Sequence, residues 1–292
     1  MTIYQLLRSE PLLFTALVGI CGLMVGSFLN VVIHRLPVML MRAWQREART
    51  ILELAQPDVA RFNLALPASH CPICNHQIRP WENIPVLSWI ALRGKCSSCK
   101  GPISPRYPLV ELSSALLSAG VAWHFGYGLP TLFALLLVWG AIALAMIDID
   151  EMLLPDAIVL PGIWIGLFAG YLGVFVSLDA SLLGAIVGYL ALATAACTAQ
   201  LVTGREGIGM GDAKLLAMLG AWAGWQAIPL VILIASAAAV VVGLLVVRRK
   251  GEPYPFGPML LVAGIVALLW GRDLYGFYGQ TFDVDFIRFL YG

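Results

Sequence analysis

Two short acidic stretches stand out in this sequence because each lies directly against a long apolar run. The first extends from Asp148 to Asp156 and the second from Gly209 to Lys214. Placing a carboxylate at the edge of the hydrocarbon region of a membrane is costly, so such residues are candidates for function. Asp148 lies nearest to the apolar run of the first stretch, and Asp212 is the only acidic residue of the second. These two carboxylates are therefore the first candidates for chemistry.

Two carboxylates that are held close together cannot both ionise cheaply, so they share one proton. The ionised member can take a proton from water while the protonated member polarises a peptide carbonyl, and together they support hydrolysis without a covalent intermediate. The sequence therefore predicts that Asp148 and Asp212 form an aspartic-protease pair. Two alternatives use the same residues: ion-pathway carboxylates in a transporter, and acidic residues without a function in a membrane anchor.

The neighbours of the pair have simpler interpretations. Gly209 and Gly211 allow a backbone to approach closely, so a substrate chain could lie beside Asp212. Lys214 does not share a helical face with Asp212, and we expect its side chain to extend to the membrane interface. The other acidic residues of the first stretch are expected to be solvated or, for the last, stabilised at a helix N-terminus: Asp150, Glu151 and Asp156.

Four of the six cysteines form two Cys-x-x-Cys pairs with 21 residues between them: Cys71, Cys74, Cys96 and Cys99. This spacing suits a structural zinc ion held by four thiolates, and four cysteines leave no open position for a catalytic water. A pair of redox-active or merely reduced turns is the alternative. His70 and His76 flank the first pair and could replace a cysteine, but we interpret them as solvated loop histidines.

The segment between the two cysteine pairs is too apolar and aromatic for a plain linker. It runs from Arg79 through Trp81 and Trp89 to Arg93-Gly94-Lys95. Its side chains could pack around a small zinc module or against the membrane interface, where tryptophan is favoured. They could also form a surface for a cofactor or a peptide.

Long apolar runs must position all of these groups. Of the 292 residues, 60% are hydrophobic and 12% are charged, against about 25% charged in soluble domains. A membrane span needs roughly 20 apolar residues. The first run is longer than the ~7–15 residues of a signal core, so we expect it to be retained. Spans are predicted at about 11–33, 109–127, 130–147, 157–177, 181–202, 226–247 and 255–271, with a shorter one at 213–224.

The positions of the basic residues predict the orientation. Ten of the 18 Lys and Arg fall in the segment 34–108, which the positive-inside rule places in the cytoplasm. Both acidic stretches then lie at the cytoplasmic face. The basic run 248–250 is also cytoplasmic if 213–224 crosses the membrane. The predicted fold is an all-α polytopic membrane protein with about eight spans. Both termini are then periplasmic, and no nucleic-acid partner is expected.

Four features in this order resemble the type IV prepilin peptidases. Gly209-Met210-Gly211-Asp212 matches the Gly-x-Gly-Asp signature of intramembrane aspartic proteases, and the stretch from Asp148 to Asp156 matches the companion motif. Residues 26–37 look like the N-terminal box of the family. The cysteine pairs and the Pro/Trp-rich segment look like its cytoplasmic domain. A presenilin-like protease would instead cut within a substrate's span, whereas this pair is expected at the cytoplasmic border.

The resemblance implies a bacterial inner-membrane enzyme of pilus assembly or type II secretion. Its substrates would be prepilins or pseudopilins, whose basic leader it would cleave at the cytoplasmic face with Asp148 and Asp212 as catalytic residues. It would also methylate the new N-terminus with S-adenosylmethionine, although the sequence has no Gly-rich nucleotide fingerprint. Our hypothesis for the methyltransferase residues is Arg93, Gly94 and Lys95.

The sequence suggests four regions along the chain. A first span (1–33) is followed by a cytoplasmic zinc-binding domain (34–108), a seven-span protease domain (109–272) and a periplasmic tail (273–292). Within the second region, Met41 to Gln56 has an Arg/Glu/Leu pattern that predicts an amphipathic helix on the membrane, closed by Pro57.

Overall fold

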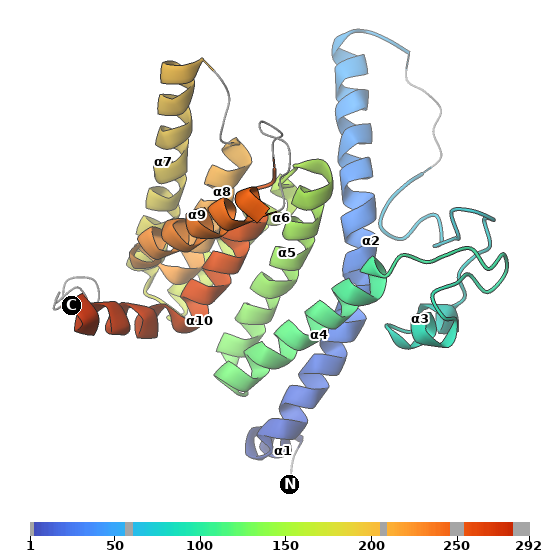
Figure 1. Cartoon of the computed structure of the whole chain (residues 1–292), viewed down its shortest axis with the longest axis horizontal. Coiled ribbons are helices and arrows are strands. Elements are labelled where there is room, and N and C mark those ends of the chain that lie inside the picture. The colour runs from blue at the N-terminus through green and yellow to red at the C-terminus, as the bar shows by residue number, and fades with distance from the viewer. Residues whose placement is uncertain (1–2, 56–60, 205–208, 246–253, 283–292) are drawn as a thin grey trace. The chain divides into compact units, whose positions relative to one another are not determined.

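The computed structural model describes residues 3–55, 61–204, 209–245 and 254–282, which form helices joined by loops (Figure 1). Within these ranges every regular element is a helix. The short ones are α1 (Ile3–Ser9), η1 (Pro80–Asn83), α3 (Leu87–Ala91) and η2 (Trp225–Ala227). The long ones are α2 (Pro11–Ile51), α4 (Arg106–Phe125), α5 (Leu129–Glu151), α6 (Asp156–Tyr171), α7 (Leu178–Thr203), α8 (Met210–Ala223), α9 (Ile228–Leu245) and α10 (Gly257–Phe282). The all-α prediction is confirmed for these residues.

The chain divides into two compact units, residues 1–143 and 144–292, and the division falls within α5. In the first unit, α2 packs along α4. A Cβ on Gly22 would lie 2.6 Å from the hydroxyl of Ser118, and one on Gly26 would lie 2.7 Å from the Cα of Glu111. Small residues let two helices approach this closely, which is how helices commonly associate in membranes.

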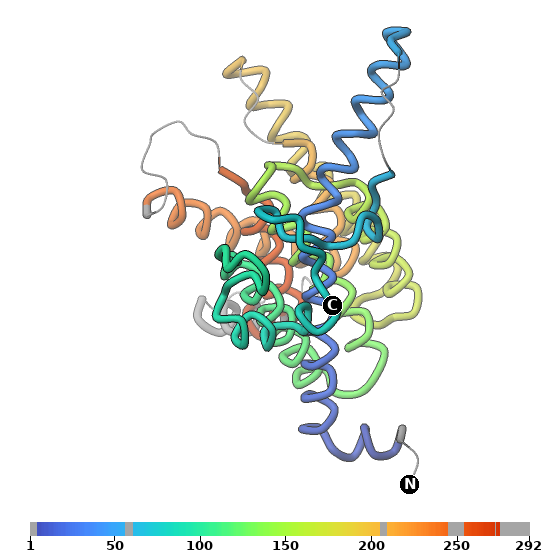
Figure 2. The backbone as a smooth tube through the Cα atoms, turned by 90° about the vertical axis from the view of Figure 1, so that its right-hand side faces the viewer, coloured from blue at the N-terminus to red at the C-terminus, as the bar shows by residue number. Residues whose placement is uncertain are grey.

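Helix α2 is longer than the sequence predicts. Its 41 residues correspond to about 61 Å, roughly twice the thickness of a bilayer's hydrocarbon core. Figure 2 shows it as one uninterrupted helix. It passes through Pro37 and ends at Ile51. The helix predicted from Met41 to Gln56 is therefore present as far as Ile51, as the continuation of α2, and its location on the membrane stays a prediction. The residues after Pro37 are mainly strong helix formers, which continue the helix despite the hydrogen bond that proline removes.

Helix α8 is the centre of the second unit. It contacts α6, α7, α9 and α10, and from Leu215 to Trp222 every residue is buried. A Cβ on Gly184 of α7 would overlap the backbone of Gly220, and one on Gly188 would overlap that of Leu216. These glycines bring α7 against α8, so the helix that carries Asp212 is enclosed by its neighbours.

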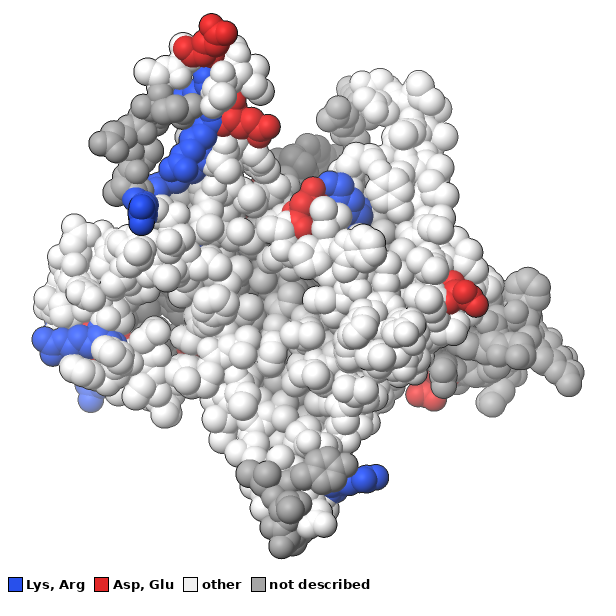
Figure 3. Space-filling model, turned by 180° about the vertical axis from the view of Figure 1, so that it is seen from behind, with Lys and Arg blue, Asp and Glu red and all other residues white. Residues whose placement is uncertain are grey.

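The helices match the predicted spans in place, but the count of eight stays a prediction. Among the described residues, four helices are long and apolar enough to cross a membrane: Pro11–Ile51, Leu129–Glu151, Leu178–Thr203 and Trp225–Leu244. Two shorter apolar helices are Asp156–Tyr171 and Gly257–Gly271. Most of the side chains visible in Figure 3 are uncharged. The basic run 248–250, Glu206, Pro57 and residues 283–292 lie outside the described ranges.

Candidate active site and metal centre

Asp148 lies in the last turn of α5, where its side chain is almost fully enclosed. Only 5% of the residue is exposed. Its Oδ2 accepts a hydrogen bond of 3.0 Å from the backbone N–H of Gly257, the first residue of α10. A helix N-terminus has free N–H groups and a partial positive charge, so α10 stabilises negative charge on this carboxylate. The position agrees with the prediction that Asp148 is the desolvated acid of its stretch.

Gly257 is a site residue that the sequence analysis did not single out. A Cβ at this position would lie 2.5 Å from Oδ2 of Asp148, closer than any real contact, so a larger residue would displace the carboxylate. The only signal was its place beside Pro258 at the start of an apolar run. That signal marks a helix boundary. It does not indicate that Gly257 contacts Asp148, which lies 109 positions earlier in the sequence.

Asp212 lies in the first turn of α8 and is half-buried. Its N–H donates to the carbonyl of Gly209, which begins the helix as its N-cap with an ordinary φ of −71°. Neither glycine of the motif has a positive φ. Instead, a Cβ on Gly211 would lie 3.3 Å from the Cβ of Leu154. The glycine therefore lets the loop after α5 approach α8, where we expected a substrate backbone.

The second unit brings the two carboxylates together. Leu154 connects them structurally. Its side chain packs against Gly211, next to Asp212, and against Gly257, which bonds to Asp148. Residues more than sixty positions apart in the sequence thus reach one place.

An ion pair lies beside the two acids. Nζ of Lys214 donates to both carboxylate oxygens of Asp156, at 2.9 and 2.8 Å. Asp156 begins α6 and Lys214 is the fifth residue of α8, so the pair joins the two helices near their starts. This partnership was not expected from the sequence, in which the two residues had separate roles. Asp150 and Glu151 are exposed as expected, but they lie in the last turn of α5 and not in a loop.

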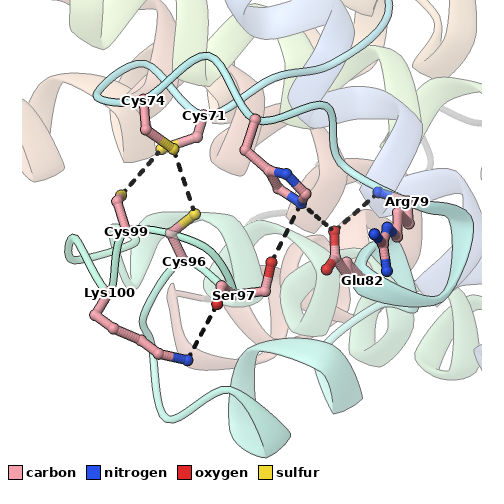
Figure 4. A network of polar contacts seen from close by, with 9 residues as sticks. Cys71, Cys74, Arg79, Glu82, Cys96, Ser97, Cys99 and Lys100 are labelled. Carbon is pink, nitrogen blue, oxygen red and sulfur yellow. Dashed lines mark hydrogen bonds and ion pairs between the residues drawn. The ribbon is translucent and has the colours of Figure 1, made fainter.

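The four cysteines of the two pairs lie together in the first unit. Their sulfur atoms all lie within 4.8 Å of one another, with Cys71 and Cys99 at 3.9 Å and Cys74 and Cys96 at 4.0 Å. Figure 4 shows the four side chains pointing toward one another from two loops. Four sulfurs bonded tetrahedrally to zinc at about 2.3 Å are about 3.8 Å apart. The cluster therefore fits a tetrahedral metal ion.

The two loops that carry the cysteines have the same backbone form. The N–H of Asn75 donates to the carbonyl of Cys71, and the N–H of Lys100 donates to that of Cys96. Asn75 and Lys100 both have a positive φ, at 57° and 62°. The backbone amides of Cys74 and Ile73 lower the pKa of Cys71 to about 7. Amides directed at sulfur stabilise the thiolate, which is the form that binds metal.

His76 connects the two cysteine loops instead of binding beside the sulfurs. Its Nε2 lies 3.3 Å from Oε2 of Glu82 and 3.3 Å from Oγ of Ser97. Glu82 also accepts the backbone N–H of Arg79 at 3.0 Å, and this bond is the main reason that the pKa of Glu82 is lowered. The contacts join the first loop, η1 and the second loop into one network (Figure 4).

Comparison with known proteins places the chain in a family. Residues 135–244 match the model of the type IV leader peptidase family, and residues 20–125 match that of the bacterial peptidase A24 N-terminal domain. A protein of Stutzerimonas stutzeri is 56% identical over 96% of this chain and 99% of its own length. The chain belongs to the type IV leader peptidase family.

Other members of this family are also similar over nearly their full length. A Pseudomonas aeruginosa protein is 53% identical over 94% of this chain and 96% of its own length. An Aeromonas hydrophila protein is 50% identical over 95% of this chain and 98% of its own length. All three relatives are named prepilin leader peptidase/N-methyltransferase. No solved structure gives a significant match.

The box of residues 26–37 that resembles the leader peptidase family has a structural role in the first unit. Nδ2 of Asn30 donates to the carbonyl of Tyr107, near the start of α4. The guanidinium of Arg35 is only 7% exposed and donates to three loop carbonyls: Asn63, Leu64 and Pro67. The box therefore attaches both the following loop and α4 to α2.

Arg93, Gly94 and Lys95 form a turn after α3. Gly94 has a φ of +67°, and a Cβ there would lie 2.9 Å from the ring of Trp89. Both the conformation and the space require glycine, so folding alone accounts for this residue. Arg93 and Lys95 are exposed. Their assignment to methyl transfer stays a prediction.

Proposed function

We propose that this chain is a membrane aspartic endopeptidase that removes the basic leader from type IV prepilins or pseudopilins and methylates the new N-terminus. The names of its relatives support both activities. The observation that carries the proposal is that Leu154 packs against both Gly211, next to Asp212, and Gly257, which bonds to Asp148, within one helical unit. A site in which an apolar environment surrounds two interacting carboxylates suits peptide hydrolysis.

In the proposed mechanism, one carboxylate of the pair is ionised and the other carries the shared proton. The ionised member removes a proton from a water molecule, which attacks the carbonyl carbon of the scissile peptide. The protonated member donates to the carbonyl oxygen as negative charge develops there. The proton then passes to the leaving nitrogen, so the pair returns to its starting state without a covalent intermediate.

The proposed location of the reaction is the cytoplasmic face of the inner membrane, with both termini in the periplasm. A prepilin would present an apolar helix to the spans and a basic leader to the cytoplasm. Asp150 and Glu151 are exposed next to Asp148 and would attract the leader's Lys and Arg. Such exposed pairs contribute only about 0–1 kcal/mol each, so they would help to orient the leader.

The test of the peptidase uses purified full-length protein, a prepilin and detergent. Asp148→Asn and Asp212→Asn should each abolish loss of the leader, since neither amide can perform both proton transfers. Asp150→Asn is the matched control, because it changes an exposed acid two residues from Asp148, and it should retain most activity. Appreciable turnover by either of the first two variants would remove that residue from the catalytic pair.

The cysteine cluster is proposed to hold a structural zinc ion through Cys71, Cys74, Cys96 and Cys99. A zinc ion would supply folding energy to a segment that has little core of its own. Elemental analysis should find about one zinc per chain. Cys71→Ser should lower the zinc content and make residues 61–105 sensitive to protease, whereas Cys21→Ser should do neither. Equal zinc content in the two variants would contradict the assignment.

The methyl donor is proposed to be S-adenosylmethionine, which would supply the methyl group. The segment Arg93-Gly94-Lys95 is proposed to contribute to its binding, through the two exposed cations on either side of the Gly94 turn. The test measures two rates in the Arg93→Gln and Lys95→Gln variants: methylation of a cleaved prepilin, and cleavage of the leader. Loss of methylation alone would support this role, whereas equal loss of both rates would indicate a general loss of folding.

A further inference from the structure

The segment between the cysteine pairs presents a row of apolar side chains to its surroundings. The row, which we call the 81–90 ridge, consists of Trp81, Ile84, Leu87 and Ile90, which are 62, 46, 65 and 60% exposed. Trp89 is directed inward instead, and its Nε1 donates to the carbonyl of Ile103 at 3.2 Å. The ridge therefore does not pack around the metal module, and exposed apolar side chains in such a group mark an interaction surface.

A buried carboxylate attaches this ridge to the start of α4. The backbone N–H of Val86, in the middle of the ridge, donates to Oε2 of Glu111 at 2.7 Å. Glu111 is only 7% exposed and lies in the second turn of α4. Val86 has a φ of +60°, which a β-branched residue adopts only when its surroundings hold it there. The position of the ridge next to α4 is therefore fixed by the fold.

Helix α4, to which the ridge is attached, also presents an apolar surface. Leu109, Leu112 and Leu116 of α4 are 59, 44 and 64% exposed. They follow each other at three- and four-residue spacing and so share one face of the helix. An exposed leucine face of this kind is suited to lipid. The hydrogen bond between Val86 and Glu111 places the ridge near the N-terminal end of α4, on a different face of the helix from these three leucines.

The charges around the ridge are almost all positive. Between residues 79 and 100 the basic residues are Arg79, Arg93, Lys95 and Lys100, and the single acidic residue is Glu82. The Glu82 carboxylate is engaged by His76 and by the N–H of Arg79. The guanidinium of Arg79 lies 5.6 Å from the ring centre of Trp81. Tryptophan and leucine beside arginine and lysine suit an anionic lipid surface.

We propose that the 81–90 ridge inserts into the headgroup region of an anionic bilayer at the end of α4. Trp81, Leu87 and Ile90 enter the boundary between headgroups and acyl chains, while the neighbouring Arg and Lys contact lipid phosphates. The bilayer thus becomes a second support for the metal module, in addition to the hydrogen bond from Val86. This docking does not depend on which reaction the second unit performs.

The test uses the full-length chain in nanodiscs of phosphatidylcholine, with and without phosphatidylglycerol. A photo-cross-linking amino acid replaces Leu87 or Ile90 in the ridge, and Gln77, an exposed polar residue of the same module, in the control. Zinc content confirms that each variant has folded. Cross-linking to lipid should be several-fold stronger from positions 87 and 90 than from 77, and it should increase with the phosphatidylglycerol fraction.

Two outcomes would overturn the proposal. In the first, positions 87, 90 and 77 cross-link to lipid equally weakly in both kinds of nanodisc, which would mean that the ridge does not reach the bilayer. In the second, an added prepilin captures the cross-links at 87 and 90 and lipid captures none. The ridge would then be a docking site for a peptide.

Discussion

At the scale of single residues, the position of Asp148 depends on a glycine in another helix. Its Oδ2 accepts a hydrogen bond from the N–H of Gly257, and there is no space for a side chain on Gly257. Sequence patterns identified Asp148 because a carboxylate next to an apolar run is unusual. They could not identify Gly257, because a glycine beside a proline is an ordinary helix boundary. Its importance arises only from contact with a distant residue.

Replacing Gly257 with alanine should therefore impair the proposed peptidase. The added Cβ would lie 2.5 Å from Oδ2 of Asp148, so the carboxylate or the start of α10 must move, which costs on the order of 1–3 kcal/mol. Cleavage of a prepilin should fall by about tenfold or more, since 1.4 kcal/mol is a factor of ten in rate. Gly271→Ala is the control within the same helix, because a Cβ there meets nothing within 4 Å. Equal rates in the two variants would show that the contact is irrelevant to turnover.

At the scale of elements, the ends of the helices carry the site. Asp148 lies in the last turn of α5 and Asp212 in the first turn of α8. Asp156 and Gly257 are the first residues of α6 and α10. The apolar runs predicted these helices closely, because burial and hydrocarbon both demand apolar length. They failed for α2, which continues past Pro37 to Ile51 because the residues that follow the proline are mainly strong helix formers. A search for apolar runs does not detect such a polar continuation.

The ion pair between α6 and α8 gives a prediction at this scale. Lys214→Met and Asp156→Asn should each change thermal stability little, because a partly exposed pair contributes about 0–1 kcal/mol. Each should nevertheless lower the cleavage rate several-fold, because the pair holds the N-terminal part of α8, which carries Asp212. The double variant should be no slower than the slower single variant, since both remove the same contact. Fully multiplicative losses would mean that the two residues act independently.

At the scale of the whole molecule, the sequence predicted a membrane protein in which a cysteine-rich segment precedes the acidic motifs. The grouping of the four cysteines agrees with that picture. Composition alone does not decide the number of spans, because α8 is surrounded by protein. A helix enclosed by neighbours need not be long or strongly apolar, so its sequence resembles that of a soluble core helix. Its 14 residues extend about 21 Å, short of a hydrocarbon core of about 30 Å.

Labelling of introduced cysteines in intact inner-membrane vesicles should decide whether α8 crosses. With eight spans, Thr203 at the end of α7 faces the cytoplasm and Asp273 in α10 faces the periplasm. Both residues are exposed, and Thr203 is preferable to Gly204, whose φ of +67° disfavours a side chain. A membrane-impermeant maleimide should therefore label Thr203→Cys and Asp273→Cys from opposite sides, against the background of the parent protein. Labelling of both from one side would mean that α8 enters and leaves the membrane on the cytoplasmic face. Asp212 would then be carried by a re-entrant helix, and substrate would reach it from the same side as Asp148.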